Sequence, residues 1–180
     1  MKGEFKLNKS SRVVIIVEGA LCAALSVVLG YLTLFRMPQG GSINLELLPL
    51  FIFSYRHGWK WGIEVGALAG LLSLMLSGYV VHPIQAVLDY PLACGMLGLS
   101  GLWRKNTTAL VIGTIIAGLA CFSCNVISGV VFFASYAPKG TNVLVYSMVY
   151  NGSFFFPKLA VNTIIALPVF WRIEKIYPLV

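Results

Sequence analysis

Six apolar segments, most of them long enough to cross a lipid bilayer, make up most of this 180-residue chain. A helix needs about 20 predominantly apolar residues to cross the hydrocarbon core of a bilayer. Only 11% of the residues are charged, which is less than half of the share usual in a soluble domain. The sequence therefore predicts an all-α integral membrane protein with one domain, residues 1–180. The six expected transmembrane helices are residues 13–35, 43–56, 58–77, 83–103, 108–134 and 144–171, with kinks at Pro157 and Pro168 in the last.

The Lys and Arg residues follow the positive-inside rule, which orients membrane helices by placing basic residues in cytoplasmic connections. They precede the first segment, occupy the second and fourth connections and follow the last segment: Lys2, Lys6, Lys9, Arg12, Arg56, Lys60, Arg104, Lys105, Arg172 and Lys175. The other connections hold only Arg36 and Lys139. We therefore expect both termini in the cytoplasm, with Trp59, Trp61 and Trp103 at that interface together with Trp171. The net charge of +7 is then explained by topology and does not indicate a nucleic-acid partner.

The sequence shows no pattern typical of an enzyme. It has no nucleophile with a plausible base, no phosphate-binding glycine loop and no metal-ligand spacing. Cys121 and Cys124 have C-x-x-C spacing, but no second pair accompanies them, so we interpret these two, Cys22 and Cys94 as small packing residues. Any active transport by this chain would need energy from a partner.

Ionisable side chains inside the apolar segments are the candidate functional residues, because charge in a bilayer is costly. They are Glu18, Glu46, Glu64, Asp89 and Lys158. Glu18 and Glu64 lie near the cytoplasmic ends of their helices, where snorkelling or pairing with basic neighbours is the simpler interpretation. Asp89 lies about 9 Å below the outer end of its helix, too deep to snorkel. It needs a cationic partner or hydrogen bonds, and the cation is either Lys158 in an internal ion pair or a bound organic cation.

Aromatic and amide side chains accompany Asp89 in the outer half of the predicted bundle. They are Tyr79, His82, Gln85, Tyr90, Asn125, Phe133, Tyr136, Tyr146, Tyr150 and Asn151. Asn125, Gly129 and Phe133 recur at every fourth residue and therefore share one helix face. An interfacial belt would explain some of the tyrosines, but not a carboxylate beside two asparagines. Aromatic faces with one carboxylate suit a flat cation, so the sequence predicts a small-molecule site.

Five segments resemble the thiamine-specific S-components of energy-coupling factor (ECF) transporters. They are Met37–Ser42, His82–Tyr90, Val126–Phe133, Ser135–Thr141 and Tyr146–Asn151. The resemblance implies a plasma-membrane protein that captures thiamine from outside with high affinity. Its partners would be a membrane coupling protein and two ATPase subunits, which alone use ATP, and it would need no cofactor of its own.

The resemblance also implies roles for particular residues. The acidic-Tyr pair Asp89-Tyr90 would contact the ligand, with Asp89 as counter-ion to the thiazolium. The other ligand contacts would come from Tyr79, Asn125, Phe133, Tyr146 and Asn151. Asn125 stands where the family often has His, and Phe133 where Trp is found, so a related pyrimidine or thiazole ligand is an alternative. Ala20 and Ala24 offer small residues for docking on the coupling protein, or else for internal packing.

Three other interpretations remain open at this point. The chain could be an S-component for a thiamine precursor or another vitamin. It could be a membrane enzyme that acts on lipid, although the catalytic pair for this is missing. It could also be a structural subunit in which Asp89 pairs with Lys158.

Overall fold

The computed structural model describes residues 9–38, 41–104 and 106–176, without the side chains of residues 9–11, 174 and 176. Lys2, Lys6 and Lys105, on which the topology prediction partly rests, lie outside the described residues. Part of the matching segment Met37–Ser42 also lies outside them.

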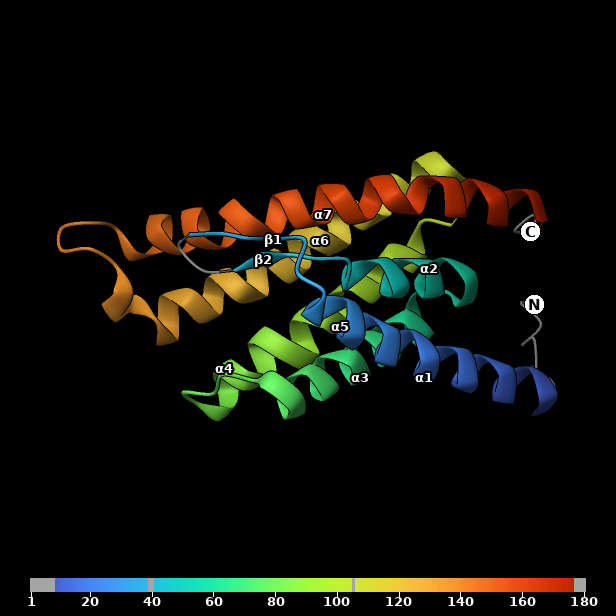
Figure 1. Ribbon diagram of the computed structural model, residues 1–180, viewed down its shortest axis with the longest axis horizontal. Helices are drawn as coiled ribbons and strands as arrows, with labels where there is room; N and C mark the ends of the chain where they lie inside the picture. Colours follow the sequence, from blue (N-terminus) through green and yellow to red (C-terminus); the bar gives the residue numbers. More distant parts are fainter. Residues whose placement is uncertain (1–8, 39–40, 105, 177–180) are drawn as a thin grey trace, which may run out of the picture.

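The described chain is helical apart from one short hairpin and the connections (Figure 1). The elements in chain order are α1 (Lys9–Tyr31), β1 (Phe35–Arg36), β2 (Ser42–Ile43), α2 (Leu47–His57), α3 (Trp59–Ser77), α4 (Pro83–Val87), η1 (Leu88–Leu92), α5 (Ala93–Leu97), η2 (Gly98–Leu102), α6 (Thr107–Phe132), η3 (Ala134–Tyr136) and α7 (Val143–Ile176).

The first connection contains a β-hairpin that the sequence does not predict. The helix expected to reach residue 35 ends at Tyr31, and Phe35 then lies opposite Ile43 in the antiparallel pair β1–β2. The Met37 N–H donates to the carbonyl of Gly41 at 3.1 Å. Gly41 has a φ of +81°, a conformation that glycine adopts without steric cost. Apolar composition alone predicts a helix for residues 32–35. In the structure, hydrogen bonds with β2 instead satisfy part of the backbone of this segment.

Four helices in the described part of the chain are long and apolar enough to cross a membrane. They lie within α1, α3, α6 and α7. The expected helix at 43–56 is shorter, because α2 has only 11 residues. The expected helix at 83–103 is not one regular helix but the succession α4, η1, α5 and η2. In contrast, α7 continues as one helix through Pro157 and Pro168, where the sequence predicts kinks.

The segment at 83–102 departs from a regular α-helix where it packs on α3. Pro91, which lacks an N–H group, lies inside the π-helical turn η1. A side chain at Gly66 or Gly70 of α3 would collide with the carbonyl groups of Cys94 and Tyr90, respectively. These glycines allow the two backbones to meet closely, as small residues do in membrane bundles. The close packing holds η1, which carries Asp89 and Tyr90, against α3.

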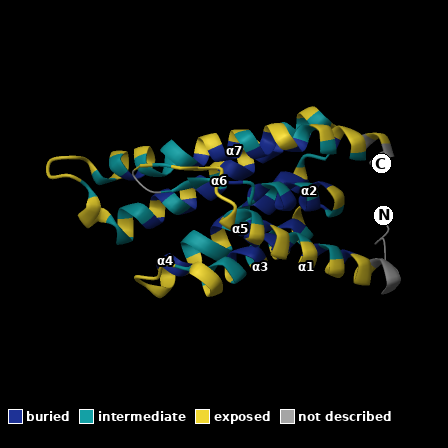
Figure 2. Ribbon diagram, in the orientation of Figure 1, coloured by how far each residue is buried: buried dark blue, intermediate teal, exposed yellow. Residues whose placement is uncertain are grey.

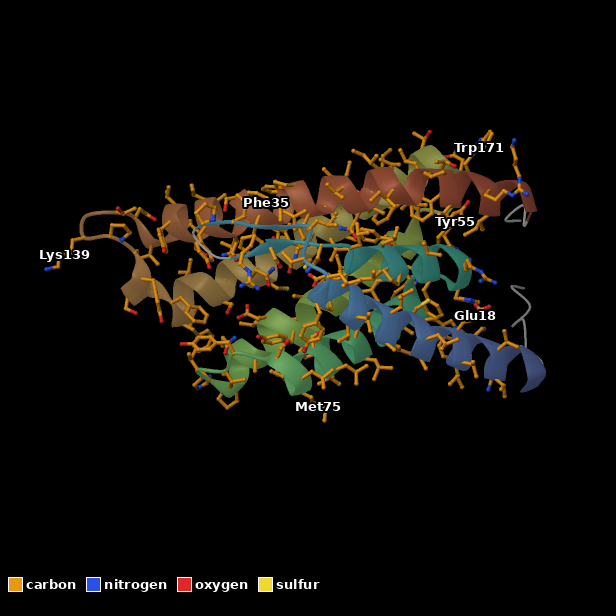
Figure 3. The ribbon with its side chains drawn as sticks, viewed as in Figure 1. Glu18, Phe35, Tyr55, Met75, Lys139 and Trp171 are labelled. Carbon is orange, nitrogen blue, oxygen red and sulfur yellow. The ribbon has the colours of Figure 1, made fainter. Side chains whose placement is uncertain are left out.

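The most buried part of the bundle surrounds α2, where Phe51, Phe53 and Tyr55 are fully buried (Figure 2). The beginning of α1 and the end of α7 lie at the same end of the bundle (Figure 1). Glu18 and Trp171 mark that end, and Lys139 marks the opposite one (Figure 3). Toward the Lys139 end the buried core gives way to partly exposed residues (Figure 2). The site described next lies in that half.

Candidate functional site

A cavity of about 880 Å³ lies between the β-hairpin, η1, α6 and α7. Its volume is within the range of small-molecule sites, roughly 300–1,000 Å³. All seven residues that the sequence analysis assigned to ligand binding line it: Tyr79, Asp89, Tyr90, Asn125, Phe133, Tyr146 and Asn151. Two of the accompanying residues do not line it: His82 caps α4, and Gln85 lies behind the cavity wall. The tertiary structure therefore brings together residues that are up to 72 positions apart, from Tyr79 to Asn151.

Asp89 presents a carboxylate to this cavity from the π-helical turn η1. Gln85, one turn earlier in α4, donates a hydrogen bond from Nε2 to Asp89 Oδ2 at 2.7 Å. Single π-helical turns are frequent at functional sites. The side chain of Asp89 is thus held by a neutral donor in a wall that faces the cavity.

The internal ion pair between Asp89 and Lys158 is wrong. Lys158 Nζ instead contacts Glu46 Oε1 at 2.7 Å, because the segment before α2 packs against α7 at that level. Among the described residues, no Lys, Arg or His lies within ion-pair distance of Asp89. A partly buried carboxylate whose hydrogen bonds come from neutral donors gains further from a cation bound beside it. The geometry therefore favours the second alternative, a bound cation.

The Glu46–Lys158 ion pair is part of the same cavity wall, a role that the sequence analysis did not assign to either residue. Asn44 Nδ2 donates to Glu46 Oε2 at 3.2 Å and to the carbonyl of Gly30 at 2.9 Å. Asn162 Nδ2 donates to the carbonyl of Asn44 at 2.8 Å. The network joins α1, the segment before α2, and α7. The sequence does give one indication of this role, since Glu46 and Lys158 are both charged residues inside apolar segments.

Aromatic rings form much of the cavity wall. Phe133 stacks on Tyr79 with 6.3 Å between ring centroids and contacts Tyr136 at 6.0 Å. Tyr146 stacks on Tyr150 at 6.1 Å. Tyr79 lies in the connection between α3 and α4, and its hydrogen bond with Tyr136 raises the pKa of the Tyr79 phenol. The rings offer flat apolar faces from three parts of the chain.

Two asparagines supply amide groups. Asn125 and Gly129 of α6 line the cavity together with Phe133, the first residue after this helix, so the three lie on one side as predicted. The side chain of Asn125 makes no hydrogen bond within the described chain, whereas Asn151 Nδ2 donates to the carbonyl of Ser147 at 2.9 Å. A methyl group at Gly129 would collide with the Ser147 hydroxyl. Gly129 thus makes room for α7, which brings Asn151 to the site.

The other residues singled out in the sequence lie away from the cavity. Glu18 pairs with Arg56 at 3.2 Å and His57 at 2.6 Å, which confirms that it pairs with basic neighbours. Glu64 is exposed on α3. Ala20 and Ala24 are exposed on α1, so they do not pack internally against the described chain. Among residues 9–38, 41–104 and 106–176, no cluster of three or more His, Cys, Asp or Glu side chains is placed to hold a metal ion.

The fold and the cavity define a helical membrane protein that binds a small molecule from within its bundle. The sequence model of the family described as "Thiamine transporter protein (Thia_YuaJ)" matches residues 16–177, and the chain belongs to this family.

Two curated relatives are both named "Thiamine transporter ThiT" and are therefore transporters rather than enzymes. The relative from Bacillus subtilis (strain 168) is 33% identical in an alignment 186 positions long, gaps included, that spans 94% of this chain and 97% of that protein. The relative from Lacticaseibacillus paracasei is 32% identical in an alignment of 163 positions that spans 81% of each chain.

Two solved structures share the fold. The structure of ThiT from Listeria monocytogenes superposes with a TM-score of 0.78 and 27% identity, covering 93% of this chain and 96% of that one. A structure described as the S component of a bacterial ECF transporter superposes with a TM-score of 0.64 over 92% of this chain and 98% of that one. At 19% identity, the second likeness shows the fold alone.

Proposed function

We propose that this chain is the thiamine-binding, substrate-capture subunit of an ECF-type vitamin importer. Membership of the thiamine transporter family supports this function. The observation that carries it is the cavity, where the carboxylate of Asp89, which has no cationic partner among the described residues, stands among aromatic and amide side chains. Thiamine consists of an aminopyrimidine and a thiazolium ring, so it offers two flat rings and one fixed positive charge.

In this proposal Asp89 is the counter-ion of the thiazolium. Tyr79, Tyr90, Phe133 and Tyr146 contact the rings, which adds cation–π attraction to apolar burial. Asn125 and Asn151 form hydrogen bonds with the pyrimidine or the hydroxyl group. The side chain of Asn125 supports its part, because a partly buried amide that makes no hydrogen bond within the described chain gains from a new partner.

The proposal includes a single domain, residues 1–180, with six membrane-crossing helices in the plasma membrane and both termini in the cytoplasm. The distribution of basic residues supports this orientation, as does the position of the beginning of α1 and the end of α7 at one end of the bundle (Figure 1). The cavity then opens toward the outer half of the membrane. Ligand captured there is released inward when two ATPase subunits hydrolyse ATP.

The membrane coupling protein would dock on α1. Ala20 and Ala24 support this, since both are exposed and lie one turn apart, where small residues let a partner helix approach closely. The captured thiamine is cargo, and we propose no cofactor for this subunit.

The Asp89→Asn variant tests the proposed function, because it keeps the shape of the side chain and removes its charge. Truncating one partner of a buried charge pair typically costs about 2–5 kcal/mol, which is roughly 30-fold or more in affinity. Calorimetric titration of the purified protein with thiamine should show this loss. Glu64→Gln, which removes an exposed carboxylate from α3, is the matched control and should bind normally. Equal affinity in all three proteins would refute the counter-ion role.

A thiamine precursor or another vitamin is the alternative ligand, because Asn125 and Phe133 differ from the residues common in the family. Competition with the separate pyrimidine and thiazole halves of thiamine distinguishes these cases. A half that binds as tightly as thiamine would show that the cavity is built for a precursor.

A further inference from the structure

Gln85 uses both ends of its side-chain amide in hydrogen bonds beside the cavity, although it does not line the cavity itself. The residue is only 2% exposed. Nε2 donates to Asp89 Oδ2 at 2.7 Å and to the carbonyl of Tyr79 at 3.1 Å. Oε1 accepts from the N–H of Val81 at 3.0 Å. One buried amide thus joins the connection between α3 and α4 to the carboxylate of the site.

The orientation of this amide is fixed by its backbone partners. The N–H of Val81 can only donate, so it faces the amide oxygen, and the carbonyl of Tyr79 can only accept, so it faces the amide nitrogen. A flipped amide would place its oxygen against both that carbonyl and the carboxylate of Asp89. The nitrogen of Gln85 is therefore directed at Asp89, where it occupies one acceptor position of Oδ2.

The connection that Gln85 holds is itself part of the cavity wall. Residues 78–82 lie outside any helix or strand, so their backbone groups need partners from elsewhere. Gln85 supplies two of these partners, and the hydroxyl of Tyr90 accepts from the N–H of Tyr79 at 2.7 Å. The ring of Tyr79 stacks on Phe133. The connection that carries Tyr79 is thus anchored twice, by Gln85 and by Tyr90.

We propose that Gln85 is a positioning residue for ligand binding: it orients the carboxylate of Asp89 toward the cation, whereas Tyr79 keeps a second anchor in the hydroxyl of Tyr90. Gln85 occupies one acceptor position of the carboxylate and leaves its other acceptor positions for the ligand. This inference rests on the proposed function, since it assumes that Asp89 faces a bound cation. Gln85 itself does not touch the ligand.

The test compares thiamine with an analogue whose thiazolium ring is replaced by a neutral thiophene. Gln85→Met keeps the length of the side chain and removes all three hydrogen bonds. We expect thiamine affinity to fall at least tenfold and affinity for the neutral analogue to fall less than threefold. In the Asp89→Asn background, Gln85→Met should cost less than threefold for thiamine, because the carboxylate that it orients is already gone.

Thr114→Val is the matched control, because Thr114 is fully buried in α6 and its hydroxyl donates to the carbonyl of Val111, within the same helix and away from the cavity. It should leave both affinities unchanged. If Gln85→Met does not fold, Gln85→Asn replaces it, since an amide one methylene shorter cannot reach Asp89 and the connection together. We expect the same selective loss from this variant.

Three outcomes would overturn this role. Equal losses for thiamine and the neutral analogue would show that Gln85 only supports the fold. Full additivity of the Gln85 and Asp89 substitutions would show that the two side chains act independently. Failure of the unchanged protein to bind thiamine would refute the proposed function and this role with it. That outcome is distinguishable from the first two, because it is measured on the unchanged protein and they are measured on variants.

Discussion

The Glu46–Lys158 ion pair allows a prediction in which the two partners respond unequally to substitution. The side chain of Lys158 is 9% exposed and that of Glu46 is 35% exposed, and the two charged atoms are 2.7 Å apart. Removing one partner of a buried pair costs about 3–5 kcal/mol, mostly because the other charge is left uncompensated. The size of the loss therefore depends on which charge remains.

Lys158→Met leaves the partly exposed carboxylate of Glu46, which also keeps its hydrogen bond from Asn44. We expect this variant to lose about 2–3 kcal/mol, below the range for fully buried pairs because water screens the remaining charge. Glu46→Met leaves the more deeply buried ammonium, so it should lose about 3–5 kcal/mol. For a chain of this length, 1 kcal/mol corresponds to about 2–4 °C in Tm.

Thermal unfolding of the purified variants in detergent, each without ligand, measures both losses. The expected shifts are roughly 4–12 °C for Lys158→Met and roughly 6–20 °C for Glu46→Met. The double variant with Met at both positions should be more stable than either single variant, because it leaves no charge behind. A double variant that loses the sum of the two single losses, or a milder effect of Glu46→Met, would refute this reasoning.

Two further predictions concern the location of the site and the docking surface. None of the four tryptophans is among the residues that line the cavity, so thiamine should quench the fluorescence of the unchanged protein weakly and that of Phe133→Trp strongly. Strong quenching in the unchanged protein would place the ligand elsewhere. Ala20→Leu and Ala24→Leu should bind thiamine normally in calorimetry but take it up poorly in cells, since bulk on α1 would block close docking. Normal uptake by both variants would exclude this docking surface.

The fold class and the candidate binding residues around Asp89 follow from the sequence because both depend on local chemistry. Long apolar segments leave no alternative to helices in a membrane. A carboxylate within such a segment, close to tyrosines and asparagines, is enough to mark Asp89 as a candidate binding residue. Asn125, Gly129 and Phe133 are spaced four residues apart. Residues at this spacing lie on the same side of a helix whatever the rest of the protein does, so their common face is predictable from the sequence.

The pairing of charges is decided only by the tertiary structure. Asp89, Glu46 and Lys158 all lie in apolar segments, and nothing in their spacing shows which carboxylate meets the lysine. Which carboxylate pairs with Lys158 depends on the level at which the segment before α2 packs against α7. Asn162 of α7 fixes this level by donating a hydrogen bond to the carbonyl of Asn44.

The irregular elements at the site also depend on contacts between distant segments. The helix expected at 83–103 breaks into η1 and its neighbours, with Pro91 inside the π-turn and Tyr90 packed on the backbone of α3 at Gly70. The hydrogen bonds of Gln85 could not be predicted either, because two of its three partners belong to the connection between α3 and α4, which has no regular structure. A sequence specifies which groups need partners, but which groups meet depends on how helices far apart in the chain pack together.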